Sequence, residues 1–261
     1  MLHHTKALAV AAALVASSLI GQAAQAASII GLVDGKTLVT IDPATRKVTS
    51  KVDIKGASSV VGIDVRPSDG MLYAVTADGG IYTVDPKSGQ ATMKSKLSET
   101  LKAAVTVTVD FNPVADRLRV ITSDGTNLRV NVDDGKAIVD GALKFKDGDA
   151  NAGKTPNVIA GAYTNSANPK PTATALYDID ASGVLVSQAP PNDGILNTIG
   201  ALGIKLDGPV AFNIVVKGED NAAWLATGGT LYSVDLKTGK AIAAGKIEGL
   251  AGKLGDIAWI D

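Results

Sequence analysis

Apolar and polar residues alternate in short runs along most of the chain, which is the pattern of half-buried β-strands. One unit recurs: an alternating strand, a turn built from Asp, Pro, Ser/Thr and Gly, and a second β-prone strand. The clearest copies are "GGIYTVDPKSGQAT" at 79–92 and "GGTLYSVDLKTGKAI" at 228–242, and the segments 36–48 and 127–138 repeat the pattern. Each copy predicts a β-hairpin.

Two more strands complete each unit. Ahead of the hairpins, a small residue or Asp precedes a bulky apolar residue in five places: Asp64-Val65, Asp110-Phe111, Ala162-Tyr163, Ala211-Phe212 and Ala258-Trp259. The steps between them are 46, 52, 49 and 47 residues, and a further short strand follows most of them, as in "RLRVIT" at 117–122. Four strands repeated five times at this period are typical of β-propeller blades, whereas a sandwich or barrel does not predict such a module.

The two ends of the repeat complement each other. The last copy, "GDIAWID" at 255–261, supplies only an innermost strand, whereas "SIIGLV" and "KTLVTID" near the start match the second and third strands of a blade. Joining them removes the open sheet edges of the ring. We therefore predict an all-β fold, a five-bladed β-propeller closed by strands from both termini, as a single domain over 27–261.

The first 26 residues predict a cleavable signal peptide. Lys6 precedes an Ala-rich apolar run, and Ala24-Gln25-Ala26 fits a small-x-small cleavage site. The apolar run over 7–20 is shorter than the roughly 20 residues that a membrane span needs. We expect an exported protein, periplasmic or extracellular, with no membrane insertion after cleavage, and a monomer.

Composition removes several kinds of chemistry. The chain has no cysteine, and both histidines, His3 and His4, lie in the predicted signal. The mature protein therefore lacks the residues for Ser-His-Asp or Cys-His catalysis and for most zinc sites, which favours a protein that is not an enzyme. With 25 basic and 26 acidic residues, the chain also gives no electrostatic reason to bind nucleic acid.

Several motifs occur in the order known from one family. "DFNPVADRLRV", "NLRVN", "DANAGKTPNVIAGAYTNS", "TALYDID" and "QAPPNDGILNTIGALG" resemble the domain of unknown function 4394 family of exported bacterial proteins, over essentially all of 28–261. The resemblance implies a repeated β architecture and export. It implies no activity, because the family carries none that transfers to these residues.

Three of the five arginines fall close together, at Arg117, Arg119 and Arg129. Aligning the second strands puts Arg119 in a column with Tyr73, Tyr177 and Trp224, and aligning the third strands puts Arg129 with Leu38, Ile81 and Leu231. A guanidinium at a packing position needs a paired acid. Asp110 is the expected partner, with Asp116 and Asp133 as alternatives.

The arginines have two interpretations. They form a salt-bridged cluster that fixes one blade against its neighbour, or some of them bind a ligand carboxylate or phosphate. An arginine trio is also found in sialidases, but the chain has no Asp-box repeat to support that enzyme class.

A candidate calcium loop lies in "DGDANAGK" at 147–154. Asp147, Asp149 and Asn151 alternate like oxygen ligands, but Val158 stands where an EF-hand has its last Glu, so a solvated turn is the alternative. Calcium is the one cofactor that the sequence suggests. We also expect this long loop to place Asp149 and Asn151 on one rim with Tyr163 and Asn165, unless Tyr163 is a core ring and Asn165 a turn residue.

Asp64 and Asp110 are the two acids in the small-residue position of the inner strands. In a ring of blades they come close at the channel, where they bind a cation, act as acid and base, or accept hydrogen bonds from backbone amides or the arginines. The first functional hypothesis is therefore a non-catalytic binding or scaffold module for an unknown small molecule or protein. The second is a calcium-dependent hydrolase of lactonase type.

Overall fold

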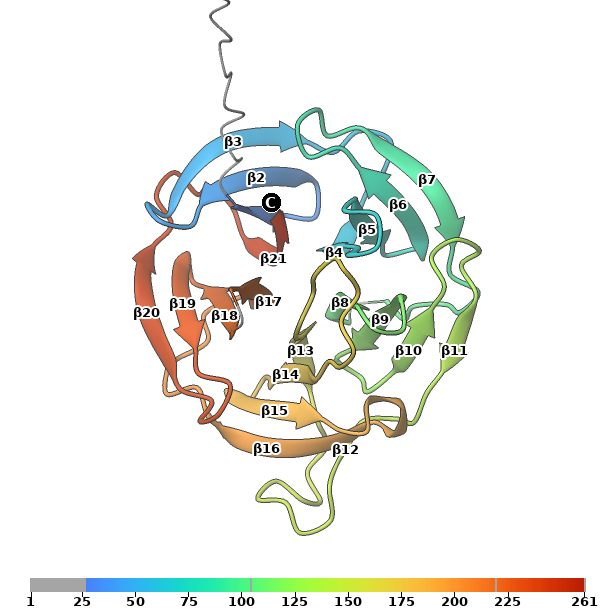
Figure 1. The fold of residues 1–261 in the computed structure, drawn as a ribbon, viewed down its shortest axis with the longest axis vertical. Helices are drawn as coiled ribbons and strands as arrows, with labels where there is room; N and C mark the ends of the chain where they lie inside the picture. The colour runs from blue at the N-terminus through green and yellow to red at the C-terminus, as the bar shows by residue number, and fades with distance from the viewer. Residues whose placement is uncertain (1–26, 104, 219, 261) are drawn as a thin grey trace, which may run out of the picture.

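The computed structural model describes residues 27–103, 105–218 and 220–260, and these form a five-bladed β-propeller (Figure 1). This confirms the predicted fold. The predicted signal peptide lies outside the described residues. None of the described helices is long and apolar enough to cross a membrane. The one helical element described is a short 3-10 turn, η1, at Pro191–Asp193.

Each blade is an antiparallel sheet whose strands run from the channel outward. Blade 1 contains β21 (Leu254–Ile260), β1 (Ser28–Val33), β2 (Thr37–Asp42) and β3 (Lys47–Asp53). Blade 2 contains β4 (Val60–Val65), β5 (Leu72–Thr76), β6 (Gly80–Val84) and β7 (Ala91–Lys96). Blade 3 contains β8 (Val107–Asn112), β9 (Arg117–Thr122), β10 (Asn127–Val130) and β11 (Ala137–Val139).

The last two blades complete the ring. Blade 4 contains β13 (Val158–Tyr163), β14 (Leu176–Asp180), β15 (Val184–Gln188) and β16 (Ile195–Ala201), and the chain arriving from blade 3 adds a short parallel strand, β12 (Lys144–Phe145), outside β16. Blade 5 contains β17 (Ala211–Lys217), β18 (Asp220–Thr227), β19 (Thr230–Val234) and β20 (Ala241–Lys246).

Strands from the two ends of the chain close the ring in blade 1. β21 pairs with β1 in antiparallel register, with Ala258 opposite Ile30. Since β1 continues into β2 and β3, the C-terminal strand supplies the innermost position that the N-terminal strands leave open. The prediction that both termini build one blade is confirmed.

The core is divided among the blade interfaces. Each pair of neighbouring blades encloses its own cluster of buried apolar side chains. Between blades 2 and 3, for example, Tyr73 meets Phe111 edge-on, with ring centroids 5.2 Å apart. One sheet face of each blade therefore packs on the opposite face of the next, which is what the period-2 pattern of the strands requires.

The inner strands are also joined by hydrogen bonds from acids to backbone amides. Asp64 accepts a bond of 2.7 Å from the Phe111 amide in the next blade, and Asp110 accepts one of 2.9 Å from the Tyr163 amide. Asp256 accepts one of 2.9 Å from Ile63. These bonds link blades 1 to 4 around the channel, and they show that two of the acids singled out in the sequence satisfy backbone donors.

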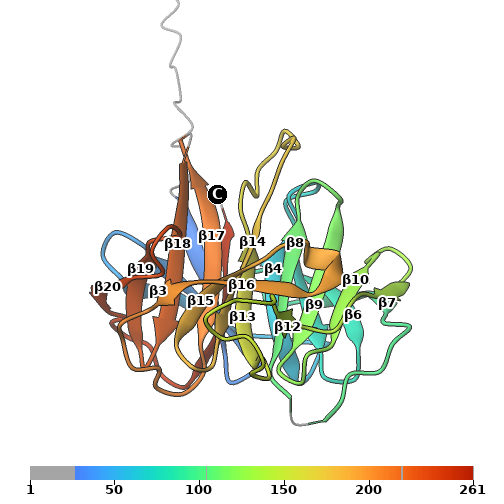
Figure 2. The same cartoon turned by 90° about the horizontal axis from the view of Figure 1, so that it is seen from below.

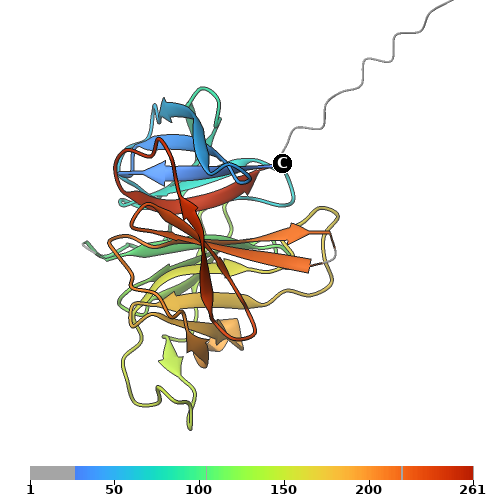
Figure 3. The same cartoon turned by 90° about the vertical axis from the view of Figure 1, so that its left-hand side faces the viewer.

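Two segments extend from one face of the ring, which we call the upper face. They are the loop 164–175, which follows β13, and the end of the β17–β18 hairpin (Figures 2 and 3). Seen along the axis, the loop lies over the centre of the ring (Figure 1). The loop 146–157 lies elsewhere, outside β16 at the periphery.

Candidate functional site

A pocket of about 370 Å³ opens at the channel mouth on the upper face. Four segments line it: 64–70 without Arg66, 166–168, 213–215 and 259–260. They come from blades 2, 4, 5 and 1, so the pocket exists only in the closed ring. Its volume lies within the range of small-molecule sites, about 300–1,000 Å³.

The two buried polar side chains of the pocket are Asp64 and Asn213, which are 6% and 7% exposed. Asp64 Oδ2 accepts the Phe111 amide, but Asp64 Oδ1 receives only a long contact of 3.5 Å from Asn213 Nδ2. Burial raises the pKa of Asp64 to about 7, although hydrogen bonds from backbone amides oppose the rise. One carboxyl oxygen therefore faces the pocket without a strong partner among the described residues.

An apolar wall stands beside these groups. Trp259 of β21 lines the pocket together with Val65, Ile214, Val215 and Ile260. The Trp259 ring stacks on Trp224 at 6.1 Å between centroids, with 25° between the planes. This stacking holds the indole in one orientation at the mouth of the channel.

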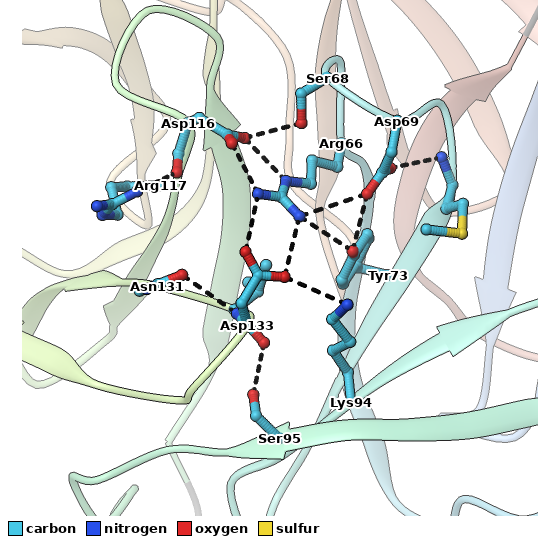
Figure 4. A network of polar contacts seen from close by, with 12 residues as sticks. Arg66, Ser68, Asp69, Tyr73, Lys94, Ser95, Asp116, Arg117, Asn131 and Asp133 are labelled. Carbon is cyan, nitrogen blue, oxygen red and sulfur yellow. Dashed lines mark hydrogen bonds and ion pairs between the residues drawn. The ribbon is translucent and has the colours of Figure 1, made fainter.

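The rim of the pocket is tied to an ion-pair network around Arg66 (Figure 4). Arg66 donates two hydrogen bonds, of 2.8 and 2.7 Å, to the carboxylate of Asp116 in blade 3, and makes longer contacts of 3.4 Å with Asp69 and Asp133. The bonds with Asp116 raise the pKa of Arg66 and lower that of Asp116. Asp69, which lines the pocket, also accepts the Tyr73 hydroxyl at 2.9 Å.

A second polar cluster lies buried between blades 3 and 4, around Arg119. Its guanidinium donates to Asp140 at 2.6 Å, Asn127 at 2.9 Å, Asn192 at 2.8 Å and the Tyr163 hydroxyl at 3.1 Å. The prediction that Asp110 neutralises Arg119 is wrong. Although the two residues are opposite each other in the β8–β9 register, the guanidinium extends outward, toward β10 and the segment after β11.

The other two arginines behave differently from each other. Arg129 Nε donates to the same Asp140 carboxylate, at 2.7 Å, so one acid serves two arginines. Arg117 is exposed and donates to the Asp116 carbonyl oxygen next to it in the chain. The three arginines therefore do not form one cluster, and none of them lines the channel-mouth pocket.

Strand register also corrects the column assigned to Arg129. It pairs with Arg119, at the position that the other blades fill with half-buried hydroxyl residues: Thr40, Thr83, Ser187 and Ser233. The position of Leu38, Ile81 and Leu231 belongs in blade 3 to Asn127. Arg119 and Asn127 are thus the polar pair that replaces packing residues, and they hydrogen-bond to each other.

Asp178 is an acid that the sequence did not single out. It is fully buried on β14, in a column that other blades fill with Ala74, Val120 and Leu225. Neither carboxyl oxygen has a hydrogen-bond partner among the described residues. Burial raises the pKa of Asp178 to about 8, and the charge of Arg119 only partly opposes the rise. The Asp178 carboxyl is therefore neutral at pH 7.

Burial also raises the pKa of Asp110, and the negative charge of Asp64 adds to the effect. This mutual influence confirms that ring closure brings Asp64 and Asp110 near each other. Asp110 lies beside Arg119 and Asp178 in a small buried space, and does not line the pocket.

The candidate calcium loop is bonded to the outermost strand of blade 4. Asp149 accepts the Thr198 amide at 2.7 Å and the Thr198 hydroxyl at 2.6 Å, and Asn151 donates to that hydroxyl at 2.9 Å. Asn151 Oδ1 accepts Lys154 Nζ. These contacts, and the absence of a group of three or more acidic or histidine ligands within the described ranges, account for the motif as a turn. Calcium binding, with Asp147 included, stays a prediction.

The structure does not bring the four expected rim residues together. Asp149 and Asn151 lie at the periphery, whereas Tyr163 is a core ring, 1% exposed, whose hydroxyl bonds to Arg119. Asn165 lies on the upper face and exchanges two hydrogen bonds of 2.8 Å with Asn221.

Sequence reasoning missed most of the pocket. It placed Ala211 in the inner-strand column, but Trp224 pairs with Asn213, so Asn213 is the equivalent of Asp64 and Asp110. Counting back from the aromatic column of the second strands would have found it. Trp259 was recorded only as a bulky residue, and Ser68 and Asp69 only fell within a turn.

The fold and the pocket define a five-bladed β-propeller with a cavity of ligand size at its channel mouth. The chain belongs to the family described as Domain of unknown function (DUF4394), whose model matches residues 37–258. This confirms the resemblance seen in the motifs. No curated protein matches the chain.

Solved structures share the fold at low identity. A protein of unknown function from Bacteroides thetaiotaomicron has a TM-score of 0.52 and 16% identity, over 88% of this chain and 63% of its own. A protein of unknown function from Bacteroides caccae has a TM-score of 0.44 and 13% identity, over 83% and 71%. The Myxococcus xanthus glutaminyl cyclase has a TM-score of 0.41 and 11% identity, over 77% and 70%.

Proposed function

We propose that this protein is an exported, non-catalytic β-propeller that binds a small molecule in the channel-mouth pocket. The observation that carries the proposal is the pocket itself, about 370 Å³ in volume, where buried Asp64 and Asn213 meet the apolar wall around Trp259. A few polar groups converging on an apolar surface are typical of ligand sites, because the polar groups orient a ligand that the apolar surface holds.

The geometry favours binding over hydrolysis. The ionisable side chains that line the pocket are Asp64 and Asp69. Asp64 accepts a backbone amide, and Asp69 is held by Arg66, the Tyr73 hydroxyl and the Met71 amide. General acid–base catalysis needs a free group positioned to exchange a proton with the substrate, and Asp69 is committed to the rim. No observation within the described residues favours the lactonase-type alternative.

A ligand-observed NMR screen of a diverse fragment library tests the proposal. Ala167→Phe places a ring in the pocket, whereas Ala173→Phe alters an exposed position of the same loop outside it. We expect fragments that bind the unmodified protein and Ala173→Phe but not Ala167→Phe. A screen without such fragments would refute the pocket as a binding site.

Export rests on the first 26 residues and has a separate test. Expression in a bacterium, followed by N-terminal sequencing of the protein recovered from the periplasm and the medium, should give a chain starting at Ala27. A chain that stays in the cytoplasm with Met1 or its successor at the start would refute export.

A further inference from the structure

The channel-mouth pocket combines an acid without a strong partner and an aromatic wall. Of its lining residues, none is a lysine, arginine or histidine. Asp64 Oδ1 is 3.5 Å from its one donor, Asn213, and the Asp64 side chain has no ion pair among the described residues. A buried carboxylate is stabilised by a counter-charge, so this pocket favours a ligand that brings one.

The surroundings of the pocket do not supply that charge. Arg66, the nearest arginine in sequence, already contacts three acids, Asp69, Asp116 and Asp133, and Lys94 shares only the last of them. Two positive charges thus stand against three negative ones at the rim. The local excess of negative charge favours cations at the channel mouth over anions.

We infer that the ligand is a small organic cation, whose ammonium group lies against Asp64 and Asn213 and whose carbon skeleton lies against Trp259. The inference rests on the proposed binding function and adds the class of ligand. An ammonium group donates hydrogen bonds to the carboxylate and amide oxygens, and it is attracted to the face of an indole ring. The apolar side chains Val65, Val215 and Ile260 cover the uncharged part of such a ligand.

Titration of the purified protein with two matched pairs of compounds tests the class. One pair is choline and the alcohol in which carbon replaces its nitrogen, and the other is pentylamine and pentanol. The fluorescence of the two tryptophans reports binding, because Trp259 lines the pocket and Trp224 stacks on it. We expect the cation of at least one pair to bind at least about 10-fold more tightly than its neutral partner.

Two variants locate the effect. Asp64→Asn keeps an oxygen that accepts the Phe111 amide but removes the charge, and should lower the affinity for the cation at least about 10-fold without changing that of the neutral partner. Asp110→Asn removes an equally buried acid that does not line the pocket, and should leave both affinities unchanged.

The outcomes separate this inference from the proposed function. Equal affinities within both pairs, no saturation with either cation, or the same preference in Asp64→Asn would overturn the cation class. If the fragment screen then still finds neutral or acidic compounds blocked by Ala167→Phe, the binding function stands and only the ligand class fails. If that screen also finds none, both fail.

Discussion

The buried carboxyl of Asp178 makes the stability of this protein depend on pH in a specific direction. Its side chain is 0% exposed and has no hydrogen-bond partner among the described residues, and burial raises its pKa from 3.8 to about 8. The folded chain therefore holds a proton that the unfolded chain releases. Stability is fully present below about pH 4, falls as the pH rises, and levels off above about pH 8.

The magnitude follows from the width of that window. Each pH unit within it costs about 1.36 kcal/mol for one such group, so the whole window amounts to on the order of 5 kcal/mol. Asp64, whose pKa is raised to about 7, and Asp110 and Asp256, whose pKa values are raised by burial, act in the same direction. The unmodified protein is thus expected to lose stability steeply between pH 5 and pH 7.

The variant Asp178→Asn isolates the contribution of one acid. Its amide does not ionise, so the loss of unfolding free energy between pH 5 and 7 should be shallower by up to about 1.4 kcal/mol per pH unit. Urea unfolding at several pH values, followed by tryptophan fluorescence, measures this slope. The slope is the diagnostic quantity, because a buried amide without a partner also lowers stability at every pH.

Asp85→Asn is the matched control. Asp85 is exposed, and backbone hydrogen bonds in its turn lower its pKa, so its proton is absent from both states in this window. That variant should keep the slope of the unmodified protein. If Asp178→Asn also kept it, the carboxyl would be ionised or hydrated in the folded protein and the reasoning would be refuted.

Three further predictions concern the joints between blades, and chemical denaturation measures each. Arg119→Met should cost about 3–5 kcal/mol, because it leaves a buried acid and two amides without their donor, whereas Arg117→Met on the exposed edge should stay within about 0.5 kcal/mol; similar losses would contradict a buried cluster. Arg66→Met should cost about 2 kcal/mol, and an unchanged midpoint would show that the ion pairs between blades 2 and 3 contribute nothing net. Gly148→Ala should cost about 1 kcal/mol for its positive φ alone, and Gly135→Ala clearly more, because its new Cβ would lie 1.8 Å from a carbonyl oxygen of blade 2; equal losses would contradict this contact.

The blade repeat was readable because its signals are local. Alternation within 79–92 and 228–242 depends on neighbouring residues, and the Asp, Ser/Thr and Gly of each turn act within a few positions. The column of inner strands failed in blade 5 for a related reason. The hairpin of β17 and β18 is longer than the others, so counting from its start reached Phe212 and missed Asn213.

The partners of the arginines were not readable in the same way. Asp140 lies after β11, in the segment that leads to blade 4, and Asn192 lies 73 residues from Arg119 in the turn η1. Their distance from the guanidinium depends on how blade 4 packs against blade 3. A strand neighbour such as Asp110 was the reasonable choice from sequence, but a long side chain reaches the partners that its direction allows.

The sequence by itself determined the all-β class, the five repeats, the closure of the ring by both ends, and the absence of histidine and cysteine after the first few residues. Hydrophobic period and turn chemistry are properties of adjacent residues, so they survive without the fold. The tertiary structure alone decided which acids are paired, which carry a proton, and that Asp64, Asn213 and Trp259 meet at one pocket. Those properties depend on burial and distance between blades, which exist only once the ring has closed.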